Sequence, residues 1–423
     1  MIMEKPVALV LGGTVPHVHL IELLKQRGFY TILLDYTPNP PAKEYADEHL
    51  PTSTLDNEAV LEVARNKKAS LVISTNVDQA NVTCCYVAEK LGLYTPYSYE
   101  TALNVTDKQR MKRIMWENNI PTSKYVQVAS LKEVENIGLS FPLMVKPADS
   151  NSANGVKRVY NQEELEKYLP DALKFSRNGK AIVEEFVVGK EISAYGVVVK
   201  GKAKLLMHQE RVSVYDGEDK VIKCYASLAP SRISEAAGRK AEMILTRIAQ
   251  AFHLDNTPLF FQGIVNGDEI SVIEFAPRVG GGISFQTIKD ATGYDIISAA
   301  LDSYLNIPIS VELWHPMNAK YAVNQIYGTN GVYDKTIGVE ALLEDGTVNV
   351  LSFYKHQGDI IDSSRASSSR IGVMVVSDLT ETGLRKKISD AFSKLDSFDV
   401  NGKSIIRKDL NLDLLWNSTT TNN

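Results

Sequence analysis

Glu274, Arg278 and a run of three glycines stand in one short stretch, VIEFAPRVGGG, residues 272–282. The apolar residues predict a strand in which Ile273 and Phe275 face a core and Glu274 faces the other way. An acid on an otherwise apolar strand pair is costly unless it is paired, and a divalent cation is a natural partner. Arg278 can bind a phosphoryl group or a carboxylate through two N–H groups, and the glycines leave room for a substrate. The alternative is a strand-end salt bridge between Glu274 and Arg278.

Gln262, on the preceding apolar run, can supply a neutral oxygen ligand to the same cation. The two runs alternate like paired strands around Asn266-Gly267. Directly opposed residues share a face of a sheet, so a two-residue turn at this dipeptide would put Gln262 on the face opposite Glu274. We therefore expect a three-residue loop, 266–268, or a bulge with the same effect.

Lys146 ends another apolar run, FPLMVKP, and precedes the small polar loop ADSNSANGV, residues 148–156. A lysine at the end of an apolar strand loses part of its hydration shell, and a bound anion can compensate for that loss. Backbone N–H groups of a loop with small side chains can point at such an anion. The loop holds one glycine, Gly155. A solvated lysine before an ordinary turn therefore remains the alternative.

The segment EEFVVGKE, residues 184–191, joins two predicted strands. The joint leaves backbone N–H and C=O groups unpaired, and the edge of adenine needs one donor and one acceptor. A carboxylate a few residues on, Glu191, can accept from both hydroxyls of a ribose. Surface charge beside a hairpin turn is the alternative.

The residues discussed so far need a scaffold, and the first hundred or so residues supply part of it. Their pattern is strand–helix–strand with continuous apolar strands, which is typical of a doubly wound parallel sheet. Asp35, after the second strand, stands where the acid that binds the ribose lies in a dinucleotide-binding site. The stretch GGTVPH from Gly12 lacks the second and third glycines of that fingerprint, and Thr14 and His17 would block a pyrophosphate. His17 and His19 have no third metal ligand nearby, so polar residues at a helix start are the better interpretation.

Further along, VTDKQRMKRIMWENNIPTS predicts a helix that Thr106 or Asp107 caps and that Asn119 and Pro121 end. From about residue 310 onward strands dominate, with one late helix, ETGLRKKISDAFSKL. The low-complexity patch SSRASSSR, residues 363–370, reads as a loop.

The composition bounds the class of protein. A chain of 423 residues predicts two or three domains, and 44% hydrophobic residues can bury real cores. The net charge of −5, without a polybasic block, argues against nucleic acid as a main partner. Three cysteines form neither a CxxC motif nor a disulfide framework, which fits a cytoplasmic location. We expect no signal peptide and no membrane-spanning segment.

Lys108, Lys146, EEFVVGKE, Gln262 and EFAPR occur in an order and at spacings that resemble the ATP-grasp superfamily, over roughly residues 1–310. The chain is most similar in character to single-grasp proteins related to carbamoyl-phosphate synthase and to amino-acid (carboxylate–amine) ligases. The resemblance implies an α/β and α+β architecture in three parts. These are a pre-ATP-grasp domain (1–105), an ATP-grasp domain (106–310, with a lid at about 120–189) and a C-terminal α+β domain (311–423).

The resemblance also implies the site. Lys108 and Lys146 would contact the phosphates of ATP, and Arg278 would face the transferred phosphoryl group. Gln262 and Glu274 would bind Mg²⁺, with Mn²⁺ left open as a substitute. The residues around the nucleoside would be Glu184, Glu185 and Val187 at the adenine and Glu191 at the ribose.

One departure concerns the metal. The family usually has an asparagine ligand two residues after the glutamate, and here that position is Ala276, which has no ligand atom. Glu274 remains, so we expect activity and leave open whether one or two ions bind. The loop after Lys146 is also poorer in glycine than is usual in the family.

The implied reaction is ATP-dependent ligation of a carboxylate to an amine through an acyl phosphate, with release of ADP and phosphate. A carbamoyl-phosphate-synthase-like phosphorylating enzyme and a non-catalytic ATP-binding protein are the alternatives. The expected partners are small-molecule carboxylate and amine substrates, whose identity the sequence leaves open, and a homodimer is one assembly it allows. Arg211 and Ser284 are candidates to touch a substrate carboxylate, with surface roles as the alternative.

Overall fold

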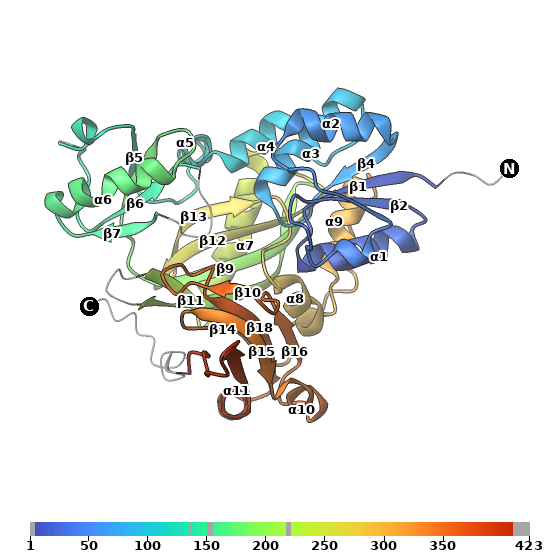
Figure 1. The fold of residues 1–423 in the computed structure, drawn as a ribbon. Coiled ribbons are helices and arrows are strands. Elements are labelled where there is room, and N and C mark those ends of the chain that lie inside the picture. The colour runs from blue at the N-terminus through green and yellow to red at the C-terminus, as the bar shows by residue number, and fades with distance from the viewer. Residues whose placement is uncertain (1–4, 136, 150–154, 217–220, 409–423) are drawn as a thin grey trace.

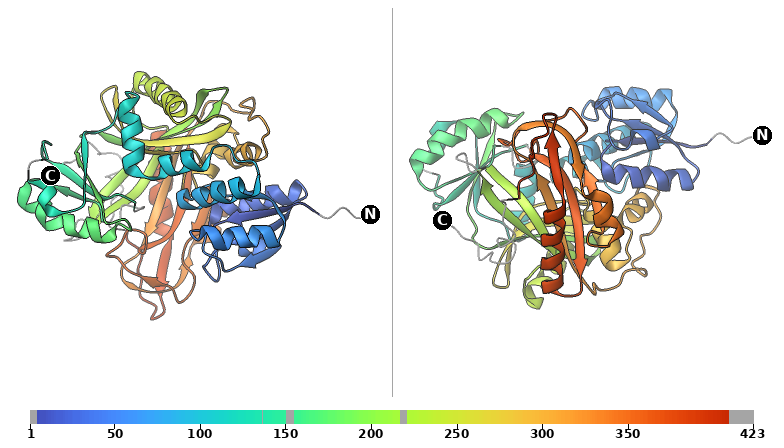
Figure 2. Two further views of the ribbon diagram at one scale, coloured as in Figure 1. Left: turned by 90° about the horizontal axis from the view of Figure 1, so that it is seen from above. Right: turned by 60° about the horizontal axis from the view of Figure 1, so that its bottom comes forward.

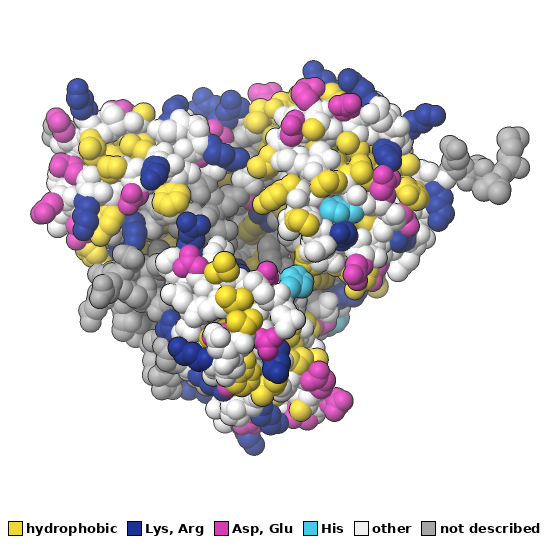
Figure 3. Space-filling model, viewed as in Figure 1, with side chains coloured by type: hydrophobic (Ala, Val, Ile, Leu, Met, Phe, Trp, Pro, Cys, Tyr) yellow, Lys and Arg dark blue, Asp and Glu magenta, His cyan; other side chains and the backbone are white. Residues whose placement is uncertain are grey.

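The computed structural model describes residues 5–135, 137–149, 155–216 and 221–408. It forms three parts (Figure 1), and the face drawn in Figure 3 is hollowed between them. Most of the predicted loop after Lys146 (150–154), part of the segment after Arg211 (217–220) and the tail lie outside the described residues.

The N-terminal part is a four-stranded parallel sheet in the order β3-β2-β1-β4, as the apolar strand pattern predicted. Helices α1 and α2 lie on opposite sides of this sheet (Figure 1), which is the consequence of right-handed crossovers. The elements are β1 (Val7–Leu11), α1 (Val15–Gln26), β2 (Tyr30–Leu34), β3 (Glu48–Leu50), α2 (Asn57–Asn66), β4 (Ala69–Ile73) and α3 (Asp78–Leu91).

The turn after β1 is closed by its own polar residues. The Gly13 N–H donates to Asp35 Oδ2 at 2.8 Å. The buried His17 ring lies 3.0 Å from Thr14 Oγ1 and 3.4 Å from Ser74 Oγ. Asp35 and His17 therefore stabilise the turn itself.

Two helices lead from this domain into the next part, α4 (Tyr99–Thr106) and α5 (Lys108–Glu117). Asp107 caps α5, because its Oδ1 accepts from the backbone N–H groups of Gln109 and Arg110, each at 2.9 Å. A small sheet in the order β5-β8-β6-β7 follows, covered by α6. Its elements are β5 (Tyr125–Val128), β6 (Leu143–Pro147), β7 (Lys157–Val159), α6 (Gln162–Phe175) and β8 (Ala181–Glu185).

The central part is an eight-stranded antiparallel sheet in the order β13-β12-β9-β10-β11-β14-β18-β16. Helix α7 packs on one face, and α8 and α9 pack on the other. The elements are β9 (Lys190–Val199), β10 (Lys202–Asp216), β11 (Val221–Ala229), α7 (Glu235–Ala251), β12 (Thr257–Asn266), β13 (Glu269–Ala276), α8 (Ser284–Thr292), α9 (Ile296–Tyr304), β14 (Lys320–Tyr327), β16 (Val350–Phe353) and β18 (Arg370–Asp378).

The C-terminal strands do not make a main sheet of their own. β14 pairs with β11, and β18 and β16 follow, so the sheet is continuous across the predicted boundary at residue 311. Figure 2 shows these strands against the middle of the molecule. The rest of this region is β15 (Gly331–Ile337), α10 (Val339–Glu344), β17 (Ile360–Ile361), α11 (Glu381–Lys394) and β19 (Asp396–Asp399). Within the described ranges, no helix is long and apolar enough to cross a bilayer.

Candidate active site

The hairpin β12–β13 brings Gln262 and Glu274 directly opposite each other. Its turn has two residues, Gly267 and Asp268, and pairs Asn266 with Glu269. A regular ladder from that turn would pair Gln262 with Ile273 and leave Glu274 on the other face. A bulge between Gln262 and Gly263 shifts the register by one residue. The expected shared face is thus confirmed through the bulge, whereas the three-residue loop was wrong.

Gln262 is held by two charged neighbours. In the amide orientation that satisfies both, its nitrogen donates to Glu274 Oε1 at 3.2 Å and its oxygen accepts from Arg211 Nη1 at 3.1 Å. Arg211 Nε lies 2.7 Å from Glu191 Oε1, on the next strand. The structure therefore places Glu191 beside Arg211 and Gln262, and its role at a ribose stays a prediction.

The donor set at this pair fits a magnesium ion that also uses substrate oxygens. Glu274 offers a half-buried carboxylate, and Gln262 offers an amide oxygen once the amide turns away from Arg211. Ala276 is buried and offers none. Among the described residues no group of three or more His, Cys, Asp or Glu side chains surrounds a cation position. Mg²⁺ accepts such a site, because it commonly binds one or two carboxylates together with waters and phosphates.

Arg278 does not pair with Glu274, as the alternative interpretation proposed, but with Asp78 at the start of α3. Nε and Nη2 donate to the two Asp78 oxygens at 2.5 and 2.6 Å, and Nη1 donates to the Val279 carbonyl at 2.7 Å. The guanidinium also stacks on the Phe260 ring, 4.9 Å from its centroid. Burial lowers the pKa of Arg278, but Asp78, together with Glu274 and Tyr97, outweighs burial and raises it. Arg278 is therefore a fixed cation, and two of its five N–H groups have no hydrogen-bond partner among the described residues.

A small cavity of about 30 Å³ joins these groups to the start of α5. Lys108, Glu274 and Arg278 line it, together with Asp78 and Ala276. The structure thus brings three of the residues implied for ATP and magnesium to one place, although they are up to 170 residues apart in the chain.

Lys146 lies in surroundings that the sequence did not predict. Its ammonium pairs with the buried carboxylate of Glu184, and Lys112 Nζ lies 2.8 Å from the other Glu184 oxygen. Lys112 is itself buried and donates to Thr122 Oγ1 at 2.8 Å. The solvated strand-end lysine of the alternative interpretation is therefore wrong.

Burial and opposite charge shift the pKa values of Glu184 and Lys112. Burial raises the pKa of the Glu184 carboxyl, but Lys146 and Lys112 outweigh it and lower the pKa to about 2. Burial lowers the pKa of Lys112, against the attraction of Glu184. Sequence reasoning missed Lys112. The available signal was its spacing of four residues from Lys108, which puts both on one face of α5.

The neighbouring acid, Glu185, faces a different environment. Its Oε1 accepts from the Ser140 N–H at 3.1 Å, and its own N–H donates to the Lys124 carbonyl at 3.0 Å. Val187 follows at the half-buried joint between β8 and β9. The proposed adenine contacts of Glu184, Glu185 and Val187 stay predictions. The carboxylate of Glu184 already pairs with two lysines, Lys112 and Lys146.

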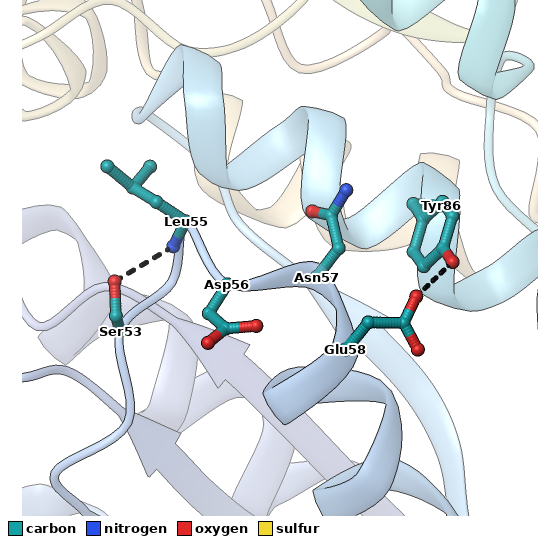
Figure 4. A pocket seen from close by; sticks show the side chains of 6 residues that line it. All are labelled: Ser53, Leu55, Asp56, Asn57, Glu58 and Tyr86. Carbon is teal, nitrogen blue, oxygen red and sulfur yellow. Dashed lines mark hydrogen bonds between the residues drawn. The ribbon is translucent and has the colours of Figure 1, made fainter.

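A wider depression lies elsewhere, between α2 and α3, with a volume of about 580 Å³. Figure 4 shows its residues: Glu58 accepts from the Tyr86 hydroxyl, and Ser53 Oγ accepts from the Leu55 N–H at 3.3 Å. It has no lysine or arginine, and it opens widely to solvent. The smaller cavity at Glu274 is therefore the better candidate, because charge chemistry converges there.

The chain is similar to known proteins in part of its sequence and in its fold. Residues 110–272 match the family model of the D-ala D-ala ligase C-terminus. The multifunctional protein ura1 of Schizosaccharomyces pombe is 23% identical over 300 residues, which are 69% of this chain and 13% of that protein. The carbamoyl phosphate synthase large chain of Clostridium acetobutylicum is 23% identical over 302 residues, 67% of this chain and 27% of that one. The chain thus spans well under a third of these relatives.

A solved structure matches along nearly the whole chain. The L-amino acid ligase of Bacillus licheniformis superposes with a TM-score of 0.78 and 19% identity, covering 94% of this chain and 100% of that one. The chain therefore has the ATP-grasp fold, as the order and spacing of its charged residues implied.

Proposed function

We propose that this chain is an ATP-dependent carboxylate–amine ligase that acts through an acyl phosphate and releases ADP and phosphate. The observation that supports it best is the bulged hairpin, which sets Gln262 opposite Glu274 while Glu274 shares a small cavity with Lys108 and Arg278. Phosphoryl transfer needs positioning and charge neutralisation more than covalent help from the protein, and this group offers both.

Each residue has a task in this proposal. Lys108 and Lys146 orient the phosphates, and the two uncommitted N–H groups of Arg278 bind the transferred phosphoryl group. Asp78 keeps the guanidinium in place because it holds two of its donors. Magnesium bound by Glu274 and Gln262 would supply neutralisation of the phosphate charge, so that an anionic carboxylate can approach.

The acyl phosphate must be kept from water, and the small sheet with α6 is the part that covers the nucleotide in this proposal. Lys112 links that part to α5, because it reaches from α5 to Glu184 on β8. The lid and the body thus share one buried ionic cluster at the base of the small sheet.

A carbamoyl-phosphate-synthase-like reaction is the second candidate, since one of the named relatives is a large chain of that enzyme. The two candidates differ in the carboxylate they activate. Bicarbonate would stimulate ATP breakdown in the second, and an organic carboxylate in the first.

The test is a screen for ADP and phosphate release with organic carboxylates and with bicarbonate, each with and without amines. Hydroxylamine should trap the acyl phosphate of the correct carboxylate as a hydroxamate, without any amine substrate. Glu274→Gln should abolish the trapping, whereas Glu269→Gln, an exposed change on the same strand, should leave it intact. Formation of AMP and pyrophosphate, or ATP binding that no carboxylate ever stimulates, would contradict the ligase proposal and favour a non-catalytic nucleotide-binding protein.

A further inference from the structure

We propose that the central sheet carries a second anion site around Arg370, which binds a distal carboxylate or phosphate group of the substrate. That the ligand is a substrate rests on the proposed ligase function. That an anion site exists rests on contacts of residues other than those proposed to bind ATP. It makes the substrate an elongated molecule with an anionic group far from the reacting one.

The site shares a face of the sheet with the proposed metal pair. Cross-strand pairs lead from Glu274 to Gln262, then to Ser193 and to Gln209. Opposed residues share a face, so this polar row crosses four strands on one side. Arg211 lies two residues beyond Gln209 and therefore on the same side.

The same face continues into the C-terminal strands. Arg211 pairs with Ser227, Ser227 pairs with Val323, and Tyr327 follows Val323 at an even spacing. Tyr327 pairs in turn with Arg370. Three strand spacings, about 14 Å, separate β10, which carries Arg211, from β18, which carries Arg370. A molecule that spans them is longer than a single small amino acid.

Among the described residues no acid forms an ion pair with Arg370. Its guanidinium donates a hydrogen bond to the Tyr327 hydroxyl, but its buried Nε has no hydrogen-bond partner within the described ranges. The nearby Gln325 Oε1, on the same face of β14, is also buried and unpartnered within the described ranges. Buried donors and acceptors are nearly always satisfied in native structures, so such a pair points to a missing ligand.

Further polar groups surround Arg370. The Tyr327 hydroxyl donates to the Cys224 carbonyl at 2.9 Å, and the fully buried Lys223 has its ammonium 5.6 Å from the centre of the Tyr327 ring. Burial raises the pKa of Tyr327 and of Tyr354, and the charge of Arg370 opposes both shifts, as a close guanidinium must.

Arg211 connects the two ends. It already binds Glu191 and Gln262, and it too lowers the pKa of Tyr327 against the effect of burial. Its charge is compensated by Glu191, whereas no described acid compensates that of Arg370. A planar guanidinium binds carboxylate and phosphate oxygens in pairs, so Arg370 defines the chemistry of the ligand as an anion of one of these two kinds.

The experiment is calorimetric titration of the full chain with inorganic phosphate and with glutarate, with magnesium and a non-hydrolysable ATP analogue filling the nucleotide site. Wild type should bind at least one probe, and the tighter one identifies the anion. Arg370→Gln should weaken binding roughly tenfold or more, because a charge-assisted pair is lost. Arg370→Lys, which keeps the charge, should give an intermediate affinity and guards against a misfolded glutamine variant.

Arg365→Gln is the matched control, because Arg365 is an exposed arginine in the loop that leads into β18. It should bind like wild type. Equal affinity in wild type and Arg370→Gln, or no binding of either probe to wild type, would overturn the proposal. If carboxylates stimulate ADP release but anion binding does not depend on Arg370, the ligase function stands and this site is refuted. If anion binding depends on Arg370 but no carboxylate stimulates ADP release, the anion site stands and the ligase function is refuted.

Discussion

Replacing Glu184 by glutamine would remove the one negative charge between two lysines. The carboxylate is 4% exposed, and both Lys112 and Lys146 point at it. Glutamine has nearly the same shape, so packing is preserved and the change isolates the charge. Two ammonium groups would then face a neutral amide at the base of the small sheet.

The magnitude follows from the pKa of Glu184, which the fold lowers from 4.5 to about 2. A shift of that size corresponds to roughly 3 kcal/mol of stability. Breaking a buried pair by removing one partner costs about 3–5 kcal/mol in other proteins. Because the folded pKa lies below the unfolded one, this contribution is complete above about pH 5 and is lost as the pH falls towards 2.

Urea unfolding at a series of pH values measures the effect. Glu184→Gln should lose about 3 kcal/mol near pH 7, and the difference from wild type should shrink below pH 4.5. Hydrogen exchange should show the loss in β8 and α5, which carry the pair. Glu185→Gln, next to it and half-buried, is the control. If both variants unfold within about 0.5 kcal/mol of wild type at neutral pH, the ionic cluster has no energetic role.

Two further predictions concern single charged groups. Lys146→Ala should slow ATP turnover roughly 10²-fold or more if this lysine neutralises phosphate, and it should also lower the urea midpoint because Glu184 loses a partner; an ADP-release assay with a near-normal rate would contradict the first part. His17→Leu should remove an acid-sensitive term: burial lowers the pKa of His17 to about 4, so the unfolded chain binds the proton first and wild type loses up to about 3 kcal/mol between pH 6.5 and 4. The difference between variant and wild type in urea midpoints over that range checks it, and parallel curves would refute it.

Local pattern sufficed for the elements and for the shared face of Gln262 and Glu274. The demand that two ligands face the same side required a bulge or an odd loop, and the structure has the bulge. The turn itself moved by one residue, to Gly267-Asp268, because a bulge can correct the register farther along the strand.

The ion-pair partners of the charged site residues could not be predicted from the sequence. Asp78 binds Arg278 across 200 positions, and Glu184 is buried only because α5 and β6 close on it from two sides. The sequence around Lys146 gives no sign that its partner Glu184 is buried. The continuation of the main sheet from β11 to β14 was missed for the same reason, since strand pairing between distant segments leaves no local signal.

The strand order of the main sheet has a consequence for synthesis on the ribosome. The meander β9–β10–β11 emerges first, β12 and β13 then add beside β9, and β14 adds beside β11. Between the emergence of residue 229 and that of residue 320, β11 has no neighbour on its outer side. An open strand edge is a template for pairing with other nascent chains. A message that stops short of β14 would therefore yield an aggregating fragment, although every residue proposed for ATP chemistry would already be present.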